Sequence, residues 1–162
     1  MVLSRKKTRV EILGSGVATD SLSLAKRKRF YRIEATKGAM EKALEMSGVK
    51  REEIDLAEVH DCFTVAEIIA LEDLGFYSPG QGKRAAVRKE TYFNGKLPIN
   101  TSGGLKACGH PVGATGVKQI VEIVTQLRGE AGERQVKGVR IGLCRSVGGS
   151  GGTAVVHILA RE

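Results

Sequence analysis

The hydrophobic and polar positions of the chain alternate between runs that suit β-strands and spacings that suit α-helices. Three short apolar runs, rich in β-branched and aliphatic residues, predict buried strands at residues 54–59, 139–144 and 153–160. A fourth strand is predicted at residues 10–13, with Gly14-Ser15-Gly16 ending it. The last two apolar runs are separated by a glycine-rich loop, so we expect them to form a hairpin.

Three other segments carry apolar residues at helical spacing, and they predict helices over residues 33–47, 64–74 and 114–128. Gly48 and Gly75 follow the first two segments and suit the left-handed conformation that ends many helices. Thr64 and Glu67 have the spacing of a capping box at the start of the second helix. Residues 76–97 carry turn signals, which predict a long loop. This order of strands and helices predicts an α/β fold with one mixed β-sheet covered by helices.

Positive charge is concentrated near the amino terminus. The 162-residue chain has a formal net charge of +8, and residues 1–37 hold 10 Lys or Arg against 3 Asp or Glu. Within residues 26–32, only Phe30 and Tyr31 interleave aromatic rings with the basic side chains. We expect a solvated basic stretch at residues 4–32, away from the motifs described below, and no nucleic-acid partner. A negatively charged ligand, such as a nucleotide-bearing thioester, would also be attracted to this stretch.

Length, hydropathy and cysteine spacing exclude several other classes of protein. A chain of 162 residues is expected to form a single domain that buries a core without disulfides. No apolar stretch is long enough to cross a membrane and no signal peptide opens the chain, so no membrane partner is expected. The three cysteines form no Cys-x-x-Cys pair, so neither a disulfide framework nor a metal site is expected. The expected location is therefore the reducing cytoplasm.

The first candidate for chemistry is His60-Asp61-Cys62-Phe63, between a predicted strand and a predicted helix. Loops at strand ends are where α/β folds place ligands and catalytic groups. The unpaired N–H groups at a helix start favour a thiolate, and His60 adds a second group that titrates near neutral pH. A buried structural cysteine beside a hydrogen-bonded histidine is the alternative, because free cysteines are often core residues.

The second candidate is the segment at residues 100–116, glycine-rich over residues 103–116, which leads into a predicted helix. Its five glycines allow the backbone to approach a ligand closely and offer free N–H groups. The spacing matches neither a P-loop nor a dinucleotide fingerprint. His110 stands between Gly109 and Pro111, which restricts its backbone and suits a base that must be aimed. Close packing of helix on sheet, with an incidental histidine, is the alternative.

The third candidate is the loop at residues 144–152, which contains four glycines in five residues. A hairpin turn needs one or two glycines, so this loop is either a flexible turn or a backbone oxyanion site. This loop and the segment at residues 103–116 together contain nine of the 21 glycines in the chain. The glycine excess is therefore local, and it surrounds the candidate catalytic residues.

These three segments, in this order, resemble the C-terminal half of thiolases, in particular the archaeal and sterol-carrier-protein-x type of acetyl-CoA acetyltransferase. Gly103-Gly104 followed by Gly109-His110-Pro111-x-Gly113-Ala114-Thr115-Gly116 matches a long and specific signature. His60-Asp61-Cys62-Phe63 matches the variant that this subgroup carries in place of Asn-Glu-Ala-Phe. The resemblance covers nearly the whole chain. It implies a thiolase-type layered fold, with residues 1–162 as a single C-terminal domain.

The resemblance also implies a reaction and a role for each candidate residue. Thiolases make or break a carbon–carbon bond between acyl-CoA thioesters, through an acyl-enzyme on a nucleophilic cysteine. His110 would activate that cysteine and help to hold the thioester oxygen, and His60 would complete the same oxyanion site. Cys62 would act as the acid/base at the acetyl carbon, and the backbone N–H of Gly148 would complete a second oxyanion site. CoA thioesters enter as substrates, and neither a cofactor nor a metal is implied.

The chain departs from the thiolase pattern in two places. Ser146 stands where most thiolases carry a second catalytic cysteine, so the acid/base role is assigned to Cys62, and Cys144 is expected to be structural. The nucleophile belongs to the N-terminal half of thiolases, and none of the three cysteines here lies in its motif. We therefore expect that the chain is inactive alone. It would act with an N-terminal half or a partner subunit, in a homo- or hetero-oligomer.

Two other functions stay open at this point. The domain could be a non-catalytic module that binds acyl-CoA or an assembly partner, although the presence of His60, Cys62 and His110 argues against a decayed site. It could also be a thiolase-like retro-aldolase, in which the scaffold is kept and the reaction differs.

Overall fold

The computed structural model describes residues 1–162 and is built on one four-stranded mixed β-sheet. The strands lie in the order β1-β4-β3-β2, and their bounds are Val10–Thr19 (β1), Leu56–Val59 (β2), Ile141–Gly148 (β3) and Thr153–Arg161 (β4). β4 pairs antiparallel with both β1 and β3, whereas β2 pairs parallel with β3. The predicted mixed sheet and the hairpin between its last two strands are confirmed.

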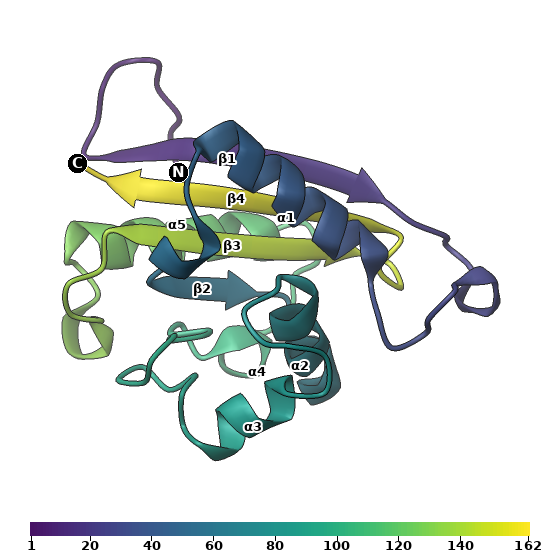
Figure 1. Cartoon of the computed structure of the whole chain (residues 1–162). Coiled ribbons are helices and arrows are strands. Elements are labelled where there is room, and N and C mark those ends of the chain that lie inside the picture. Colours follow the sequence, from purple (N-terminus) through teal and green to yellow (C-terminus); the bar gives the residue numbers. More distant parts are fainter.

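Five helices accompany the sheet: α1 (Glu34–Ser47), α2 (Thr64–Asp73), α3 (Gly82–Val87), α4 (Gly104–Cys108) and α5 (Thr115–Arg128). Figure 1 shows α1 on one face of the sheet and α5 on the other, with α2, α3 and α4 beyond the β2 edge. Short 3₁₀ turns lie at Leu24–Lys26, Arg51–Glu53 and Gly132–Arg134. None of the helices is long and apolar enough to span a bilayer.

The three longer helices were predicted correctly from their periodicity, and two details of the predictions were wrong. Gly48 and Gly75 do adopt the left-handed conformation after α1 and α2, with φ of 68° and 80°. The capping box predicted at Thr64 is absent, because Phe63 is the N-cap of α2 and no side chain caps it. The loop predicted at residues 76–97 contains α3, and α4 lies inside the glycine-rich segment. Both missed helices have six residues or fewer and show no periodicity.

Glycine does not end β1, contrary to the prediction that the strand stops at residue 13. The strand continues to Thr19 through Gly14 and Gly16, which face α1. A Cβ on Gly16 would lie 2.0 Å from the Ala39 carbonyl oxygen, and one on Gly14 would lie 2.2 Å from the Ala43 carbonyl oxygen. The two glycines therefore allow the backbone of α1 to lie directly against the strand.

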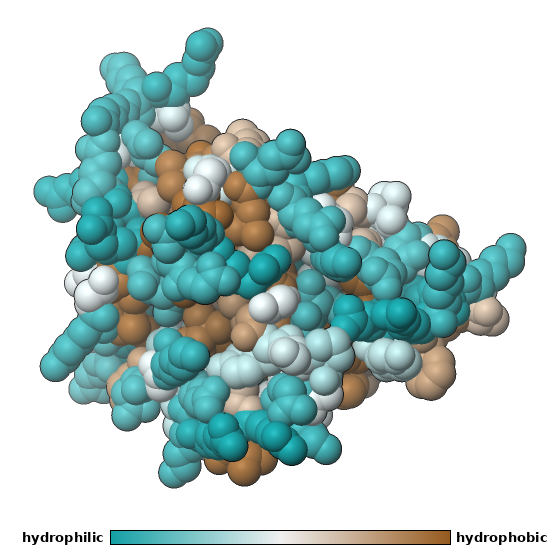
Figure 2. Space-filling model, in the orientation of Figure 1, coloured by the Kyte–Doolittle hydropathy of each residue, from teal (hydrophilic) through white to brown (hydrophobic).

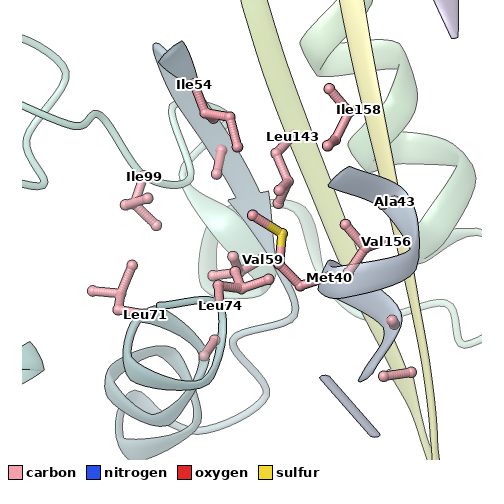
Figure 3. Close-up of a cluster of buried hydrophobic side chains, with 14 of the residues drawn as sticks. Met40, Ala43, Ile54, Val59, Leu71, Leu74, Ile99, Leu143, Val156 and Ile158 are labelled. Carbon is pink, nitrogen blue, oxygen red and sulfur yellow. The ribbon is translucent and has the colours of Figure 1, made fainter. Parts of the chain in front are cut away.

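Two hydrophobic clusters hold the helices on the sheet. The larger one lies between the sheet, α1 and α2, and it includes Met40, Val59, Leu143, Val156 and Ile158 (Figure 3). The smaller one joins α5 to the opposite face of the sheet through residues that include Ile123, Leu127 and Leu159. The outer surface seen in the view of Figure 1 is mostly hydrophilic, with apolar side chains showing between the polar ones (Figure 2). Packing on both faces holds the sheet in place, and with it the carboxyl ends of the strands where the candidate residues lie.

Candidate active site

The candidate motifs meet at one end of the sheet, where strands β1, β2 and β3 terminate. Because β1, β2 and β3 run in the same direction, the three loops that follow them lie together at the carboxyl ends of these strands. These loops are residues 20–33, the His60–Phe63 segment and the turn at residues 149–152. The glycine-rich segment that carries His110 reaches the same end, since the His60 and His110 rings are in contact. Sheet topology thus assembles segments that are far apart in the sequence.

His60 and His110 form the centre of the site. Their ring centroids are 4.8 Å apart, and the rings are nearly perpendicular, at 82°. His60 is buried at 7% exposure, and its Nδ1 has no hydrogen-bond partner. Burial lowers the pKa of His60 below its ordinary value, and the charge of Arg145, together with that of His110 whenever His110 is protonated, lowers it further. His60 is therefore a neutral imidazole near pH 7, able to donate one hydrogen bond.

His110 contacts Thr115, a residue at the start of α5. The Thr115 hydroxyl donates to the Pro111 carbonyl oxygen at 3.3 Å and lies 2.7 Å from Nδ1 of His110. When the hydroxyl donates to the carbonyl, it accepts from the imidazole, and in that arrangement the proton is on Nδ1 and Nε2 is free as a base. Thr115 is buried at the first turn of α5, whereas His110 is exposed. The signature histidine is thus aimed by a side chain five positions later in the chain.

Cys62 is exposed on the segment between β2 and α2, two residues after His60. The neighbouring Asp61 holds this segment against the glycine-rich loop, because its carboxylate accepts a hydrogen bond from Leu105 N at 3.0 Å. Cys108 is also exposed, and its thiol contacts the Ser102 carbonyl oxygen at 3.4 Å. Cys144 is buried in the smaller core, where burial raises the pKa of its thiol to about 12. Of the three cysteines, Cys62 is the one on the segment that carries His60.

Gly148 is the last residue of β3, at the start of the turn that leads to β4. Its carbonyl oxygen accepts a hydrogen bond from Gly151 N at 3.1 Å. No hydrogen bond joins Gly148 to either histidine, although Gly148 lies at the end of β3, beside the carboxyl end of β2. Ser146, two residues earlier, faces the start of α5, since a Cβ on Gly116 would lie 3.8 Å from Ser146 Oγ.

A buried carboxylate, which sequence reasoning missed, ties β2 to the glycine-rich loop. Glu58 is 1% exposed, and its carboxylate accepts hydrogen bonds from Ser102 N at 3.0 Å and Ser102 Oγ at 2.7 Å. Lys118 on α5 donates to the same carboxylate at 3.2 Å and also contacts Ser102 Oγ. Burial raises the pKa of Glu58, and the hydrogen bonds from Ser102 and Lys118 oppose that rise. The residue lies two positions before His60 and holds that histidine's strand to the His110 segment.

Asn100 makes a second tie that the sequence analysis did not single out. Its side-chain oxygen accepts a hydrogen bond from Val59 N at 2.8 Å, and its Nδ2 donates to Glu67 Oε2 at 3.0 Å. The backbone of Asn100 is left-handed, with φ of 53°, a conformation that asparagine tolerates better than most residues. This contact also explains the missing capping box, because the Glu67 carboxylate is directed to Asn100. The one available signal was an asparagine directly before a Thr-Ser-Gly-Gly turn.

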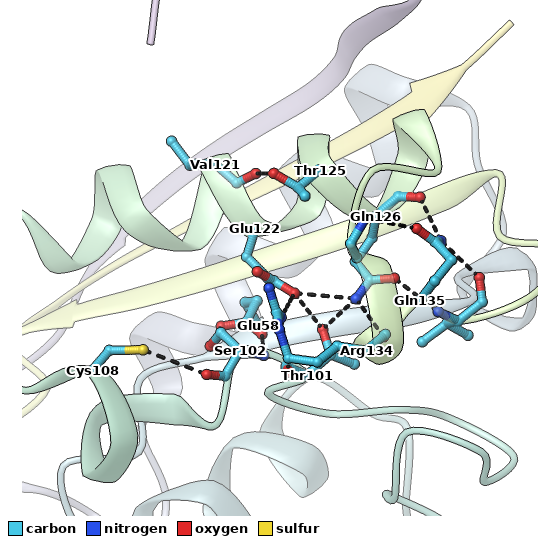
Figure 4. Close-up of polar contacts among 12 residues, drawn as sticks. Glu58, Thr101, Ser102, Cys108, Val121, Glu122, Thr125, Gln126, Arg134 and Gln135 are labelled. Carbon is cyan, nitrogen blue, oxygen red and sulfur yellow. Dashed lines mark hydrogen bonds and ion pairs between the residues drawn. The ribbon is translucent and has the colours of Figure 1, made fainter.

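A third polar cluster links α5, the turn after it and the start of the glycine-rich loop (Figure 4). The Glu122 carboxylate accepts hydrogen bonds from Thr101, Gln126 and Arg134. Burial favours the neutral acid, but these three hydrogen bonds outweigh burial and lower the pKa of Glu122. Arg134 also donates to the Thr101 carbonyl oxygen at 3.1 Å. The cluster fixes Thr101, where the loop that carries His110 begins.

The basic stretch at residues 26–32 belongs to the loop that follows β1, and the start of this loop contacts the glycine turn after β3. The loop at residues 20–33 lies against the glycine turn after β3, through Asp20 N to Gly152 O at 2.9 Å and Ser150 Oγ to Leu22 O at 3.0 Å. Figure 1 shows this loop projecting from the carboxyl end of β1. Arg27 is folded onto the Ser21 carbonyl oxygen, so part of the stretch is structural and not solvated.

The fold and this site define a thiolase-like domain. The family model described as "Thiolase C-terminal domain-like" matches residues 16–161, and the chain belongs to this family. The chain is 49% identical over 154 residues to an acetyl-CoA acetyltransferase of Methanothermobacter thermautotrophicus, covering 95% of this chain and 40% of the relative. It is 42% identical over 156 residues to sterol carrier protein 2 of Bos taurus, covering 94% of this chain and 28% of the relative. The chain thus spans well under half the length of these two relatives.

Solved structures agree with this assignment. The fold is similar to that of the Ltp2-ChsH2(DUF35) aldolase, with a TM-score of 0.83 at 25% identity, over 94% of this chain and 39% of that one. It is also similar to a monomeric SCP2-thiolase like protein from Mycobacterium smegmatis, with a TM-score of 0.68 at 19% identity, over 94% of this chain and 29% of that one. The layered thiolase-type fold expected from the sequence is confirmed.

Proposed function

We propose that this chain is the C-terminal half of a thiolase that transfers acyl groups between CoA thioesters. It would supply acid/base and oxyanion groups to a nucleophilic cysteine on an N-terminal half or partner subunit. The observation that carries the proposal is the contact between the His60 and His110 rings, 4.8 Å apart, with the exposed Cys62 two residues after His60 in the chain. The high identity to archaeal proteins named acetyl-CoA acetyltransferase supports it.

In the first half-reaction, the proposed role of His110 is that of a base. Its Nε2, left unprotonated by the Nδ1 contact to Thr115, takes the proton of the partner's cysteine. The thiolate attacks the thioester carbonyl, the carbon–sulfur bond to CoA breaks, and the departing CoA thiolate receives the proton. The neutral ring of His60 donates a hydrogen bond to the thioester oxygen as charge develops on it.

In the second half-reaction, the proposed role of Cys62 is to remove a proton from the methyl carbon of acetyl-CoA. The resulting carbanion attacks the carbonyl carbon of the acyl-enzyme and forms the new carbon–carbon bond. The bond to the partner's cysteine sulfur breaks, and the proton held by Cys62 is returned to that sulfur. Thiolysis is the same sequence reversed. The proposed contribution of Gly148 is a backbone N–H directed to the oxyanion of the acyl-enzyme.

The surface of α5 supports the proposal of a missing half. Val117 and Val121 are separated by one helical turn on this helix and are 47% and 43% exposed. Ile12 on β1 is 40% exposed, and a groove of about 600 Å³ lies between residues 1–12 and α5. An apolar stripe of this kind is typical of a surface that another polypeptide covers. We propose that the N-terminal half, in an oligomer in the reducing cytoplasm, packs on this face.

A retro-aldolase is the second candidate, favoured by the similarity to the Ltp2-ChsH2(DUF35) aldolase. In that reaction a base removes the hydroxyl proton of a 3-hydroxyacyl thioester and the bond between its second and third carbons breaks. A carbonyl compound leaves, and the acyl-CoA carbanion takes up a proton. No acyl-enzyme forms, so the two candidates differ in their need for the partner's cysteine.

Joining this chain to the N-terminal part of the M. thermautotrophicus acetyl-CoA acetyltransferase, up to the matched region, tests the proposal. We expect the fused protein to cleave acetoacetyl-CoA with added CoA, whereas this chain alone does not. The matched control is His110→Ala, which should reduce the rate by at least about 100-fold by removing a general base. Cleavage of a 3-hydroxyacyl-CoA without thiolysis would establish the aldolase instead, and a folded fusion without either activity would refute both.

A further inference from the structure

Two carboxylates flank His60, and both bind one turn of the glycine-rich segment. Glu58 lies two residues before His60 and accepts hydrogen bonds from Ser102 N at 3.0 Å and Ser102 Oγ at 2.7 Å (Figure 4). Asp61 follows His60 directly and accepts a hydrogen bond from Leu105 N at 3.0 Å. Hydrogen bonds to a charged acceptor are stronger than those to a neutral one. The turn is therefore held on both sides of this histidine.

A pair of glycines gives this turn the shape that admits Asp61. Gly103 and Gly104 are both left-handed, with φ of 88° and 65°, a conformation that glycine adopts without strain. A Cβ on Gly104 would collide with the Asp61 carboxylate, so the missing side chain makes room for that carboxylate. Gly104 N also donates to Ser102 Oγ at 3.2 Å. The backbone of the turn thus fits a carboxylate from the neighbouring segment.

Lys118 binds the Glu58 carboxylate from the far end of the segment that carries His110. It lies on α5, eight residues after His110, and its Nζ donates to Glu58 Oε2 at 3.2 Å and contacts Ser102 Oγ. Glu58 is 1% exposed, and a buried carboxylate without a counter-ion would destabilise the fold. The segment is therefore fastened to Glu58 both before and after His110.

The contact between the His60 and His110 rings depends on what holds the two segments. The ring centroids lie 4.8 Å apart, and Nδ1 of His60 has no hydrogen-bond partner. An edge-to-face ring contact is weak beside a charged hydrogen bond. Because a displacement of about 1 Å in a catalytic site can lower a rate about 100-fold, the proposed reaction depends on the contacts that fix these segments.

We propose that Glu58 and Asp61 are positioning residues for the histidine pair: they clamp the turn before His110 to the segment that carries His60, and so set the spacing of the two rings. The assignment rests on the proposed catalytic roles of these histidines and names the groups that hold them in place. Neither carboxylate touches a reacting atom in this role. Removing one should therefore slow the chemical step and leave substrate binding nearly unchanged.

The first measurement is the nuclear Overhauser effect between the ring protons of His60 and His110, read by NMR in the 162-residue chain. We expect Asp61→Ala to lose this effect. Asp61→Asn keeps an oxygen that accepts from Leu105 N and should retain it. Glu58→Ala should lose it too. If this second variant does not fold, because Glu58 is fully buried, the half-buried Asp61 keeps the test decisive.

Asp55→Ala is the matched control. This carboxylate lies just before β2, at the other end of the strand, and accepts hydrogen bonds from Arg140 N at 2.7 Å and Ile141 N at 2.9 Å. We expect its removal to leave the Overhauser effect unchanged, whatever it does to stability. An unchanged effect in a folded Asp61→Ala chain, or an equal loss in Asp55→Ala, would overturn the clamp.

The second measurement is the kinetics of acetoacetyl-CoA cleavage by the fused protein described above. We expect Asp61→Ala to lower kcat by about 10- to 100-fold with KM changed by less than about twofold, and Asp61→Asn to keep kcat within about threefold. A raised KM with unchanged kcat would overturn the positioning role. Loss of the Overhauser effect in Asp61→Ala supports the clamp even if the fused protein is inactive, because the NMR readout needs no partner half. An inactive parent fusion counts against the proposed function alone.

Discussion

Asp73 is a buried carboxyl group whose ionisation opposes folding. Its side chain is 2% exposed, and the nearest cation, Arg32, lies at 3.9 Å. Burial raises the pKa of Asp73 from 3.8 to about 6, and the hydrogen bond from Ile33 N and the charge of Arg32 only partly offset this rise. The folded chain therefore binds this proton more tightly than the unfolded chain does. Stability falls as pH rises from 3.8 to 6 and stays reduced above that range.

Replacing this carboxyl with an amide should stabilise the protein at neutral pH. We expect Asp73→Asn to raise the free energy of unfolding by about 3 kcal/mol at pH 7.5, since the amide cannot ionise. The gain should shrink as pH falls below 6 and vanish near pH 3.5, where both states of the parent chain are protonated. Urea unfolding at the two pH values measures it. An equal gain at both would show that ionisation of Asp73 is not the cause.

Close contact between β1 and α1 depends on two glycines, and a single methyl group tests it. In Gly16→Ala, the new Cβ would meet the Ala39 carbonyl oxygen at 2.0 Å, so the helix must move off the strand. We expect a loss of about 3 kcal/mol in the free energy of unfolding. Gly113→Ala is the matched control, because nothing lies within 4 Å of its Cβ, and we expect it to change stability by less than about 0.5 kcal/mol. Equal effects in a urea titration would contradict this account of β1.

The elements that periodicity predicted are those that bury one face. Helices α1 and α5 and strands β2 to β4 each pack an apolar face against another layer. The continuation of β1 was missed because glycine is unfavourable in strands. The two glycines are needed there because the backbone of α1, over 20 residues away in the sequence, packs directly against them. Helices α3 and α4 are too short to show a period.

Local motifs identified His60, Cys62 and His110 as candidates, but they could not identify what holds them. Glu58 bonds to a residue 44 positions away, and Arg145 to one 85 positions away. A charged side chain in a sequence is ordinarily exposed, so nothing in the local pattern indicates that these two are buried. Their positions follow from the parallel pairing of β2 with β3, which brings Glu58 opposite Cys144 and Val59 opposite Arg145.

At the scale of the whole molecule, the candidate catalytic residues lie together at one end of the sheet, and one face of α5 is apolar and exposed. The histidine pair, Cys62, the glycine turn after β3 and the basic loop at residues 20–33 share that end. Helix α5, which carries the exposed Val117 and Val121, lies on the face of the sheet opposite α1. A domain of this design suits a site that is completed by another polypeptide, which is the central claim of the proposed function.

The most direct measurement separates the two half-reactions in the protein fused to the archaeal N-terminal part. Mass spectrometry reports the acyl group on the partner's cysteine after mixing with acetyl-CoA, and a second assay reports acetoacetyl-CoA turnover. We expect that Cys62→Ala still becomes acylated but loses turnover by at least about 1,000-fold, whereas Ser146→Ala retains both reactions. Full turnover in Cys62→Ala together with its loss in Ser146→Ala would contradict the account.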